Sequence, residues 1–82
     1  MIWGEFLAMM AEDGVTLDRI EYGALDEEGK PYVRYTLIRF HNGRYLYFDL
    51  ALPESSRPVT RLTIRRIAHT LGLPYKKYGH LY

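Results

Sequence analysis

"TLIRFHNGRYLYFDL", from Thr36 to Leu50, is the part of the chain whose structure can be predicted most fully. At its centre, Asn42-Gly43 separates two runs rich in aromatic and branched residues, which is typical of a β-hairpin with a two-residue type I′ turn. Both central positions of that turn need a positive φ, which Asn and Gly tolerate. The turn sets the register, so His41 is expected to face Arg44. The pairs that follow are Phe40 with Tyr45, Ile38 with Tyr47, and Leu37 with Phe48.

This register divides the hairpin into two faces, because successive side chains of a strand point to opposite sides. One face is almost wholly apolar and is expected to form the core; it carries Val33, Tyr35, Leu37, Leu46, Phe48, Leu50 and Leu52. The other face mixes aromatic, polar and charged groups; it carries Tyr32, Arg34, Thr36, Ile38, Phe40, Tyr45, Tyr47, Asp49 and Ala51.

The run before the hairpin, "LDRIEYGAL" from Leu17 to Leu25, is predicted to add a third strand through the turn sequence "DEEGKP". With Glu28-Gly29 at the tip of the turn, its apolar residues fall on the core face of the hairpin. The expected pairs are Ala24 with Val33, Tyr22 with Tyr35, and Ile20 with Leu37. The chain is therefore predicted to contain a three-stranded antiparallel meander.

Helices are predicted on both sides of the meander. The apolar residues from Ile2 to Asp13 recur at helical spacing, and Gly14 follows as a C-terminal cap. The stripe expected in the core is Ile2, Phe6, Met9 and Met10, with Trp3 and Leu7 beside it. After the turn-rich loop "LPESSRP", a second helix is expected to begin at Thr60 and to end at Gly72. Its buried positions, spaced i, i+3, i+4 and i+7, are Ile64, Ile67, Ala68 and Leu71.

The predicted order is helix, three strands, helix, in a single domain that covers residues 1–82. Two amphipathic helices packed on one face of a three-stranded meander make a two-layer α+β domain. The second sheet face is then an exposed apolar patch, and such patches normally mark a partner. A homodimer or a small protein partner is expected at Ile38, Phe40, Tyr45 and Tyr47. A platform that stacks single-stranded bases is the alternative.

The composition, 48% hydrophobic with a net charge of +1 over 82 residues, is too apolar for a disordered chain. The absence of cysteine excludes disulfides and thiolate metal sites. The apolar runs are much shorter than a membrane span, and "MIWGEFLAMM" lacks the basic region of a signal peptide. A cytoplasmic protein without membrane contact is expected.

Charge is distributed unevenly along the chain. Before residue 30 there are eight acidic residues and one basic residue, whereas from Lys30 onward there are ten basic residues and two acidic ones. Arg57, Arg61, Arg65 and His69 recur every four residues and are predicted to form a basic ridge on the solvent side. Contacts with the phosphates of RNA or DNA are expected from Arg57, Arg61, Arg65, Lys76 and Lys77. The alternative is that the acidic and basic halves attract each other within the fold.

No catalytic, cofactor or metal site is predicted. The three histidines, His41, His69 and His80, do not lie at metal-ligand spacing from one another or from a carboxylate motif. Ser55 and Ser56 lack a nucleophile-elbow sequence, and the glycines form no phosphate-binding loop.

The stretch "TIRRIAHTLGLPYKKYGHLY", from Thr63 to Tyr82, has the spacing of a helix-turn-helix, with Gly72 at the turn. Such a motif would place Tyr75, Lys76, Lys77 and His80 in the major groove of DNA. Pro74 and Gly79 leave only a short recognition helix, and any helix that ends at a glycine gives the same pattern. A DNA-binding protein that uses this segment is one alternative function.

The same stretch, as far as Leu81, and the helix-strand-strand-strand-helix order resemble the HicA-type toxins of type II toxin–antitoxin systems. The resemblance covers most of the chain in topology, and implies a fold similar to the double-stranded-RNA-binding domain and cleavage of messenger RNA. The family's activity depends on a histidine after a glycine at the start of the second strand. Here that place reads "GKPYVRY", with Pro31 or Tyr32 where the histidine would stand, and His41 lies at the far end of the strand.

These observations predict a small non-catalytic binding module of double-stranded-RNA-binding-like topology. It is expected to contact nucleic acid through its basic C-terminal helix. A HicA-like ribonuclease is the enzymatic alternative, and it needs a catalytic histidine that the sequence does not place.

Overall fold

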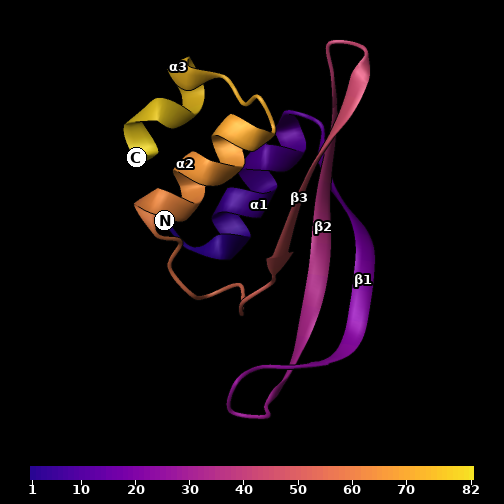
Figure 1. The fold of residues 1–82 in the computed structure, drawn as a ribbon. Coiled ribbons are helices and arrows are strands. Elements are labelled where there is room, and N and C mark those ends of the chain that lie inside the picture. Colours follow the sequence, from indigo (N-terminus) through magenta and orange to yellow (C-terminus); the bar gives the residue numbers. More distant parts are fainter.

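The structure, a computed structural model, describes all residues from Met1 to Tyr82 and confirms the predicted α+β order. Figure 1 shows a three-stranded antiparallel sheet in the order β1–β2–β3, with the helices on one of its faces. The elements are α1 (Trp3–Glu12), β1 (Val15–Leu25), β2 (Pro31–His41), β3 (Arg44–Ala51), α2 (Arg61–Thr70) and α3 (Tyr75–Tyr78), followed by a 3₁₀ turn (Gly79–Leu81). The longest helices have ten residues, about half of what a membrane-spanning helix needs.

The β2–β3 hairpin is confirmed in its turn and in its register. Asn42 and Gly43 have φ values of 50° and 80°, as a type I′ turn requires. His41 faces Arg44, and the pairs that follow are those predicted: Phe40 with Tyr45, Ile38 with Tyr47, and Leu37 with Phe48. The two central residues of the turn therefore determine which side chains face the helices.

The predicted register between β1 and β2 is wrong. Ile20 pairs with Tyr35 rather than Leu37, Ala24 pairs with Tyr32 rather than Val33, and Leu17 takes the place opposite Leu37. Two bulges cause the difference, because β1 has one extra residue between Leu17 and Ile20 and another between Glu21 and Ala24. Gly23, inside the second bulge, has a φ of 83°.

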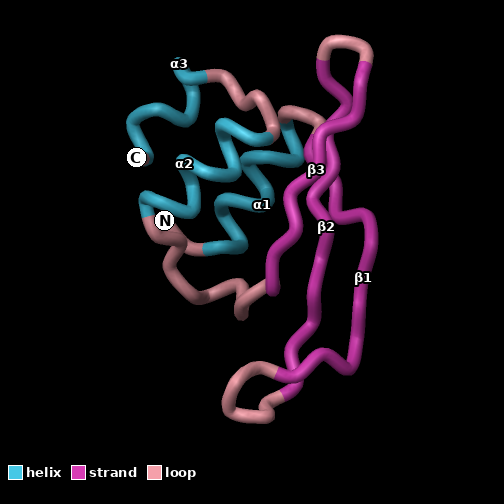
Figure 2. The backbone as a smooth tube through the Cα atoms, viewed as in Figure 1, coloured by secondary structure: helices cyan, strands magenta, loops and turns pink.

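The turn between β1 and β2 is also longer than the predicted two-residue tip. The Asp26 carboxylate accepts hydrogen bonds from the backbone N–H groups of Glu28 and Lys30, both at 2.9 Å. The Asp26 carbonyl accepts from Gly29, whose φ is 78°. Because the Asp26 side chain and carbonyl accept hydrogen bonds from backbone N–H groups of the turn, the loop between Leu25 and Pro31 is longer than the two-residue loop of a tight hairpin. Figure 2 shows this loop at the end of the sheet that the helices leave uncovered.

The core lies between the helices and one half of the sheet. Ten of its twelve buried residues come from the helices and the segments that flank them, and only Val15 and Leu37 come from strands. The β1 residues expected in the core are exposed instead, Ile20 by 45% and Tyr22 by 75%. The reason is that the sheet is longer than the helix layer, so no helix packs on its β1–β2 end (Figure 1). The predicted core positions on β2, β3 and the residue after β3 are half-buried apart from Leu37. Of these, Leu46, Phe48, Leu50 and Leu52 pack against the core, whereas Val33 and Tyr35 are not part of that packing.

Both long helices follow their sequence signals closely. The Thr60 hydroxyl caps α2 by accepting a hydrogen bond from the backbone of Thr63 at 3.2 Å, and Gly72 ends α2 with a φ of 62°. The predicted buried positions of α2 are buried, as are Phe6 and Met10 of α1. Met9 of the predicted stripe is half-buried. Ile2 is exposed, because it precedes the helix in extended conformation and pairs with Pro58 instead.

Arg39 joins the sheet to the ends of both helices. It lies on the same face of β2 as Leu37, two residues nearer the turn, and its side chain is partly buried. Its Nε donates to the carbonyl of Asp13 at 2.9 Å, and its Nη1 donates to the carbonyls of Leu71 and Gly72 at 2.9 and 2.7 Å. Those carbonyls stand at the C-terminal ends of α1 and α2, where helical hydrogen bonding runs out and the helix dipole favours a cation.

We expect Arg39→Ala to lower the free energy of unfolding by about 2–3 kcal/mol, because three carbonyls lose one charged donor. Arg34→Ala is the matched control: it removes an exposed arginine from the other face of the same strand and should change the value by less than about 0.5 kcal/mol. Urea unfolding followed by circular dichroism measures both. Equal effects of the two substitutions would contradict a joining role for Arg39.

Candidate nucleic-acid interface

The exposed side of α2 carries a concentrated positive charge. Arg61, Arg65, Arg66 and His69 are all exposed, and the helix contains no acidic residue. Arg61 and Arg65 were predicted from their four-residue spacing. Arg66 was not, because it falls outside that spacing, although it lies only about 100° around the helix from Arg65.

The arginines of α2 have no carboxylate partner. The ion pairs in the structure are Lys30 with Glu28 and Lys77 with Glu12 and Asp13, so no acid lies within 4.0 Å of a guanidinium of α2. Arg61 is the first residue of the helix, where the dipole is positive and an acidic residue would be stabilising. The positive charge of this helix is therefore not neutralised within the fold.

Arg57 was predicted to belong to the same basic ridge as Arg61, Arg65 and His69, but it does not lie on the helix. It belongs to the loop before α2, where its carbonyl accepts a hydrogen bond from the backbone of Trp3 at 2.9 Å. Its side chain lines a shallow depression together with Asp26 and Lys30 of the β1–β2 turn. The ridge is thus a helical row of Arg61, Arg65 and His69, because the helix begins four residues after Arg57.

The two lysines of α3 differ in their surroundings. Lys76 is exposed and makes no ion pair, so its charge is available to a ligand. The Lys77 ammonium lies 3.0 Å from a carboxylate oxygen of Glu12 and 3.0 Å from one of Asp13. This is the one place where the basic part of the chain pairs with the acidic part over a long sequence separation, so the attraction between the halves accounts for one lysine only.

Asp13, Lys77 and Tyr78 form a cluster that fixes α3 against the end of α1. The Tyr78 ring is wholly buried, and its hydroxyl donates to Asp13 at 2.5 Å. That hydrogen bond, assisted by Lys77, lowers the pKa of Asp13 below its ordinary value. Burial and the same hydrogen bond raise the pKa of Tyr78 strongly, and the hydrogen bonds to Asp13 and Glu12 raise the pKa of Lys77.

The segment expected as a recognition helix in the helix-turn-helix alternative is short. α3 has four residues, and a 3₁₀ turn follows it at once. Tyr78 points into the core, and Lys77 is held by α1, which leaves Tyr75, Lys76 and His80 exposed. Such a segment offers little more than one helical turn to a DNA groove.

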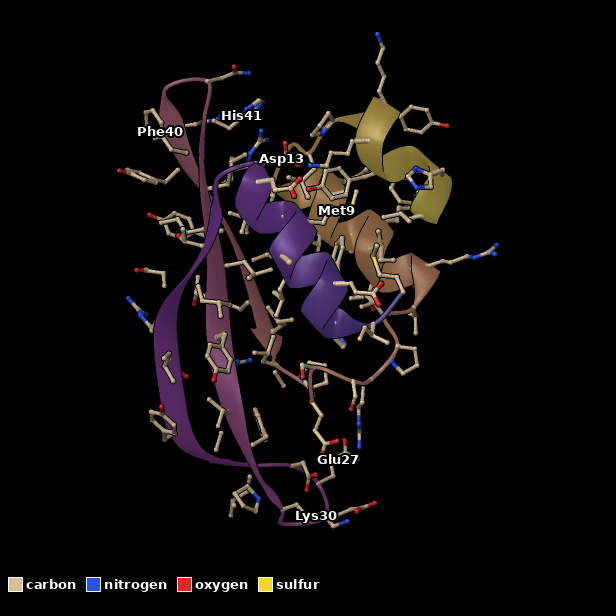
Figure 3. All side chains as sticks on the ribbon, turned by 180° about the vertical axis from the view of Figure 1, so that it is seen from behind. Met9, Asp13, Glu27, Lys30, Phe40 and His41 are labelled. Atoms are coloured by element: carbon tan, nitrogen blue, oxygen red, sulfur yellow. The ribbon has the colours of Figure 1, made fainter.

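The sheet face opposite the helices is aromatic near the β2–β3 turn. Phe40, Tyr45 and Tyr47 are exposed by 60%, 59% and 54%, and Ile38 beside them is half-buried. The rings of Phe40 and Tyr45 lie 4.9 Å apart at an interplanar angle of 58°. Figure 3 shows Phe40 pointing away from the helices and its neighbour His41 pointing toward them.

The histidines occupy separate places in the fold. His41 stands at the end of β2, where its ring is close to Gly72, and His69 packs its ring edge-on against Tyr82. His80 is exposed in the 3₁₀ turn. None of them lies within 4.0 Å of a carboxylate, and no three His, Asp or Glu side chains are grouped as a metal site would need.

Comparison of this chain with protein-family models, with curated protein sequences and with solved structures finds no match.

The free energy of unfolding should fall at both ends of the pH range. Asp13 contributes stability above its ordinary pKa of 3.8, and this contribution is lost as the pH falls below that value. Tyr78 has a raised pKa in the folded protein, so its contribution is present below its ordinary value of 10.0 and is lost as the pH rises beyond it.

Tyr78→Phe should lower the free energy of unfolding at neutral pH by about 1–2 kcal/mol, because the hydrogen bond to Asp13 is lost. It should also reduce the loss of stability above pH 10. Tyr75→Phe, which removes an exposed hydroxyl three residues away, is the control and should leave both unchanged. Denaturant unfolding across the pH range measures these effects, and identical profiles for the two variants would contradict the role assigned to Tyr78.

Proposed function

We propose that this protein is a small binding module that contacts nucleic acid through the exposed arginines of α2. The observation that carries the proposal is the unneutralised charge of that helix, with Arg61, Arg65 and Arg66 exposed and no carboxylate within 4.0 Å. Arginine is well suited to phosphate, because its planar guanidinium can donate two parallel hydrogen bonds to two oxygens. Lys76 adds a further unpaired charge from α3.

The placement of α2 is compatible with access to a large polyanion. α2 lies in the helix layer, on the side of the molecule opposite the exposed aromatic face, and its arginine-bearing side faces solvent. Core residues occupy its other side, since Ile64, Ile67 and Ala68 are all buried. The buried side packs the helix onto the core, and the arginines project from its other side.

The proposal contains no catalytic step. A HicA-like ribonuclease would use a histidine at the start of the second strand, and β2 begins there with Pro31 and Tyr32. His41 lies at the opposite end of that strand, against Gly72. RNA incubated with the protein is therefore expected to be recovered intact.

The double substitution Arg61→Glu with Arg65→Glu should weaken binding by on the order of 10- to 100-fold at low salt, because attraction to two phosphates is replaced by repulsion. It should also reduce the slope of log K against log[salt] by about 0.9 for each phosphate that the protein no longer neutralises. Filter binding with single-stranded RNA, duplex RNA and duplex DNA at several salt concentrations measures both quantities.

The matched control is Arg19→Glu with Arg34→Glu, which alters net charge equally but lies on the sheet. This control should bind within a few-fold of the unaltered protein, since overall charge alone acts weakly through screened solvent. An equal loss of affinity in both double variants would show that only net charge matters. Absence of binding to all three nucleic acids at low salt would overturn the proposal.

A further inference from the structure

The aromatic patch formed by Ile38, Phe40, Tyr45 and Tyr47 has the size of an interface centre. An aromatic side chain offers about 150–250 Å² to a partner, and three of the four side chains are more than half exposed. They supply about 350 Å² per copy, against the roughly 800 Å² that each partner contributes to a stable interface. The patch side chains alone supply less than half of that area, so the uncharged neighbours of Ile38 on the same face, Thr16 and Thr36, are needed in the contact as well.

The charges around the patch favour a second copy of this chain over a nucleic acid. The patch itself carries no charge, and the rest of the outer face holds Asp18, Glu21 and Asp49 against Arg19 and Arg34. A face with slightly more acid than base does not attract a polyanion.

A two-fold axis through the patch would bring together the halves of two sheets that lie nearest the β2–β3 turn. Asp18, Arg19 and Asp49 border the patch, because they line one depression with Tyr47, whereas Glu21 and Arg34 lie farther along the strands toward the β1–β2 turn. Rotation about that axis directs Glu21 and Arg34 away from the partner, so these two groups keep their hydration. Isologous contacts of this kind close after two copies, and sheets pack face to face about 10 Å apart.

The small core of the domain also favours association. Its core holds twelve buried residues, and nothing within the chain covers the outer face of the sheet. Small domains with a limited core commonly gain stability by forming oligomers.

We infer that two copies pair through the aromatic patch and form a four-layer dimer, with helices outside and sheets inside. α2 lies on the face of the sheet opposite the patch, so the two arginine-bearing helices are directed to opposite sides of the dimer. The dimer then has two separate phosphate-binding surfaces and joins two nucleic-acid segments. This second step rests on the proposed function of α2.

Sedimentation equilibrium over a range of concentrations tests the dimer. The unaltered protein should show a concentration-dependent dimer, and Tyr47→Glu should weaken the dimer by on the order of 100-fold, because it buries a charge in the contact between the two copies. Arg61→Glu with Arg65→Glu should leave the dimer unchanged. A monomer at every concentration, or an unchanged mass for Tyr47→Glu, would overturn the inference.

Cross-linking tests the same contact without the glutamate variant, which could lose the dimer simply because it misfolds. The chain has no cysteine, so a single Tyr47→Cys gives one reactive site at the patch, and Leu62→Cys gives an exposed control site on α2. A short bis-maleimide should join two copies of the first variant and not of the second. Equal yields of cross-linked dimer would count against pairing through this face.

Energy transfer between donor-labelled and acceptor-labelled oligonucleotides tests the joining of two segments. Single-stranded RNA, duplex RNA and duplex DNA are used in separate runs. The unaltered protein should bring donor and acceptor together, whereas Tyr47→Glu should bind without energy transfer. A dimer that binds without energy transfer would overturn the two-sided arrangement.

The remaining outcomes separate the two proposals. A dimer that binds no oligonucleotide would remove the proposed function and leave the pairing intact. A monomer whose nucleic-acid binding is abolished by Tyr47→Glu would identify the patch as a base-stacking platform and overturn the dimer.

Discussion

The three hydrogen bonds of the Arg39 guanidinium to the ends of α1 and α2 connect the two layers of this domain. They depend on the β2–β3 turn, because the type I′ geometry at Asn42-Gly43 decides that Arg39 faces the helices rather than solvent. A shift of one residue in register would expose the guanidinium on the outer face and bring Phe40 against the helices. The turn thus determines the register of the hairpin, and the register determines whether Arg39 can bond the ends of both helices.

Much of the fold could be predicted because its signals are local. Three such signals determine the conformation of only a few neighbouring residues: the turn at Asn42-Gly43, the helix cap at Thr60 and the helix-ending Gly72. The structure confirms all three predictions. The β1–β2 register failed because it depends on bulges at Leu17–Ile20 and Glu21–Ala24, and on an Asp26 side chain that replaces a tight turn. Alternation of apolar residues cannot show where a strand inserts an extra residue.

The candidate site was predictable to a similar extent. Exposure of Arg61 and Arg65 follows from helical periodicity, since Ile64 and Ile67 occupy the buried side of the same helix. The pairing of Lys77 with Glu12 joins residues 65 positions apart, and no local pattern could reveal it. The alternation of strand residues places Arg39 on the same face as Leu37, so a partly buried arginine with hydrogen-bond partners could be predicted there. The partners could not be predicted, because they are backbone carbonyls, which every residue type has.

The bulges of β1 have a consequence for how the molecule meets others of its kind. An eleven-residue edge strand offers a row of unpaired backbone groups on which further strands could add without limit. Two bulges interrupt that row and bend the strand, and Asp18, Arg19 and Glu21 place hydrated charges along it. The edge is thereby a poor template for fibrous growth by addition of further strands.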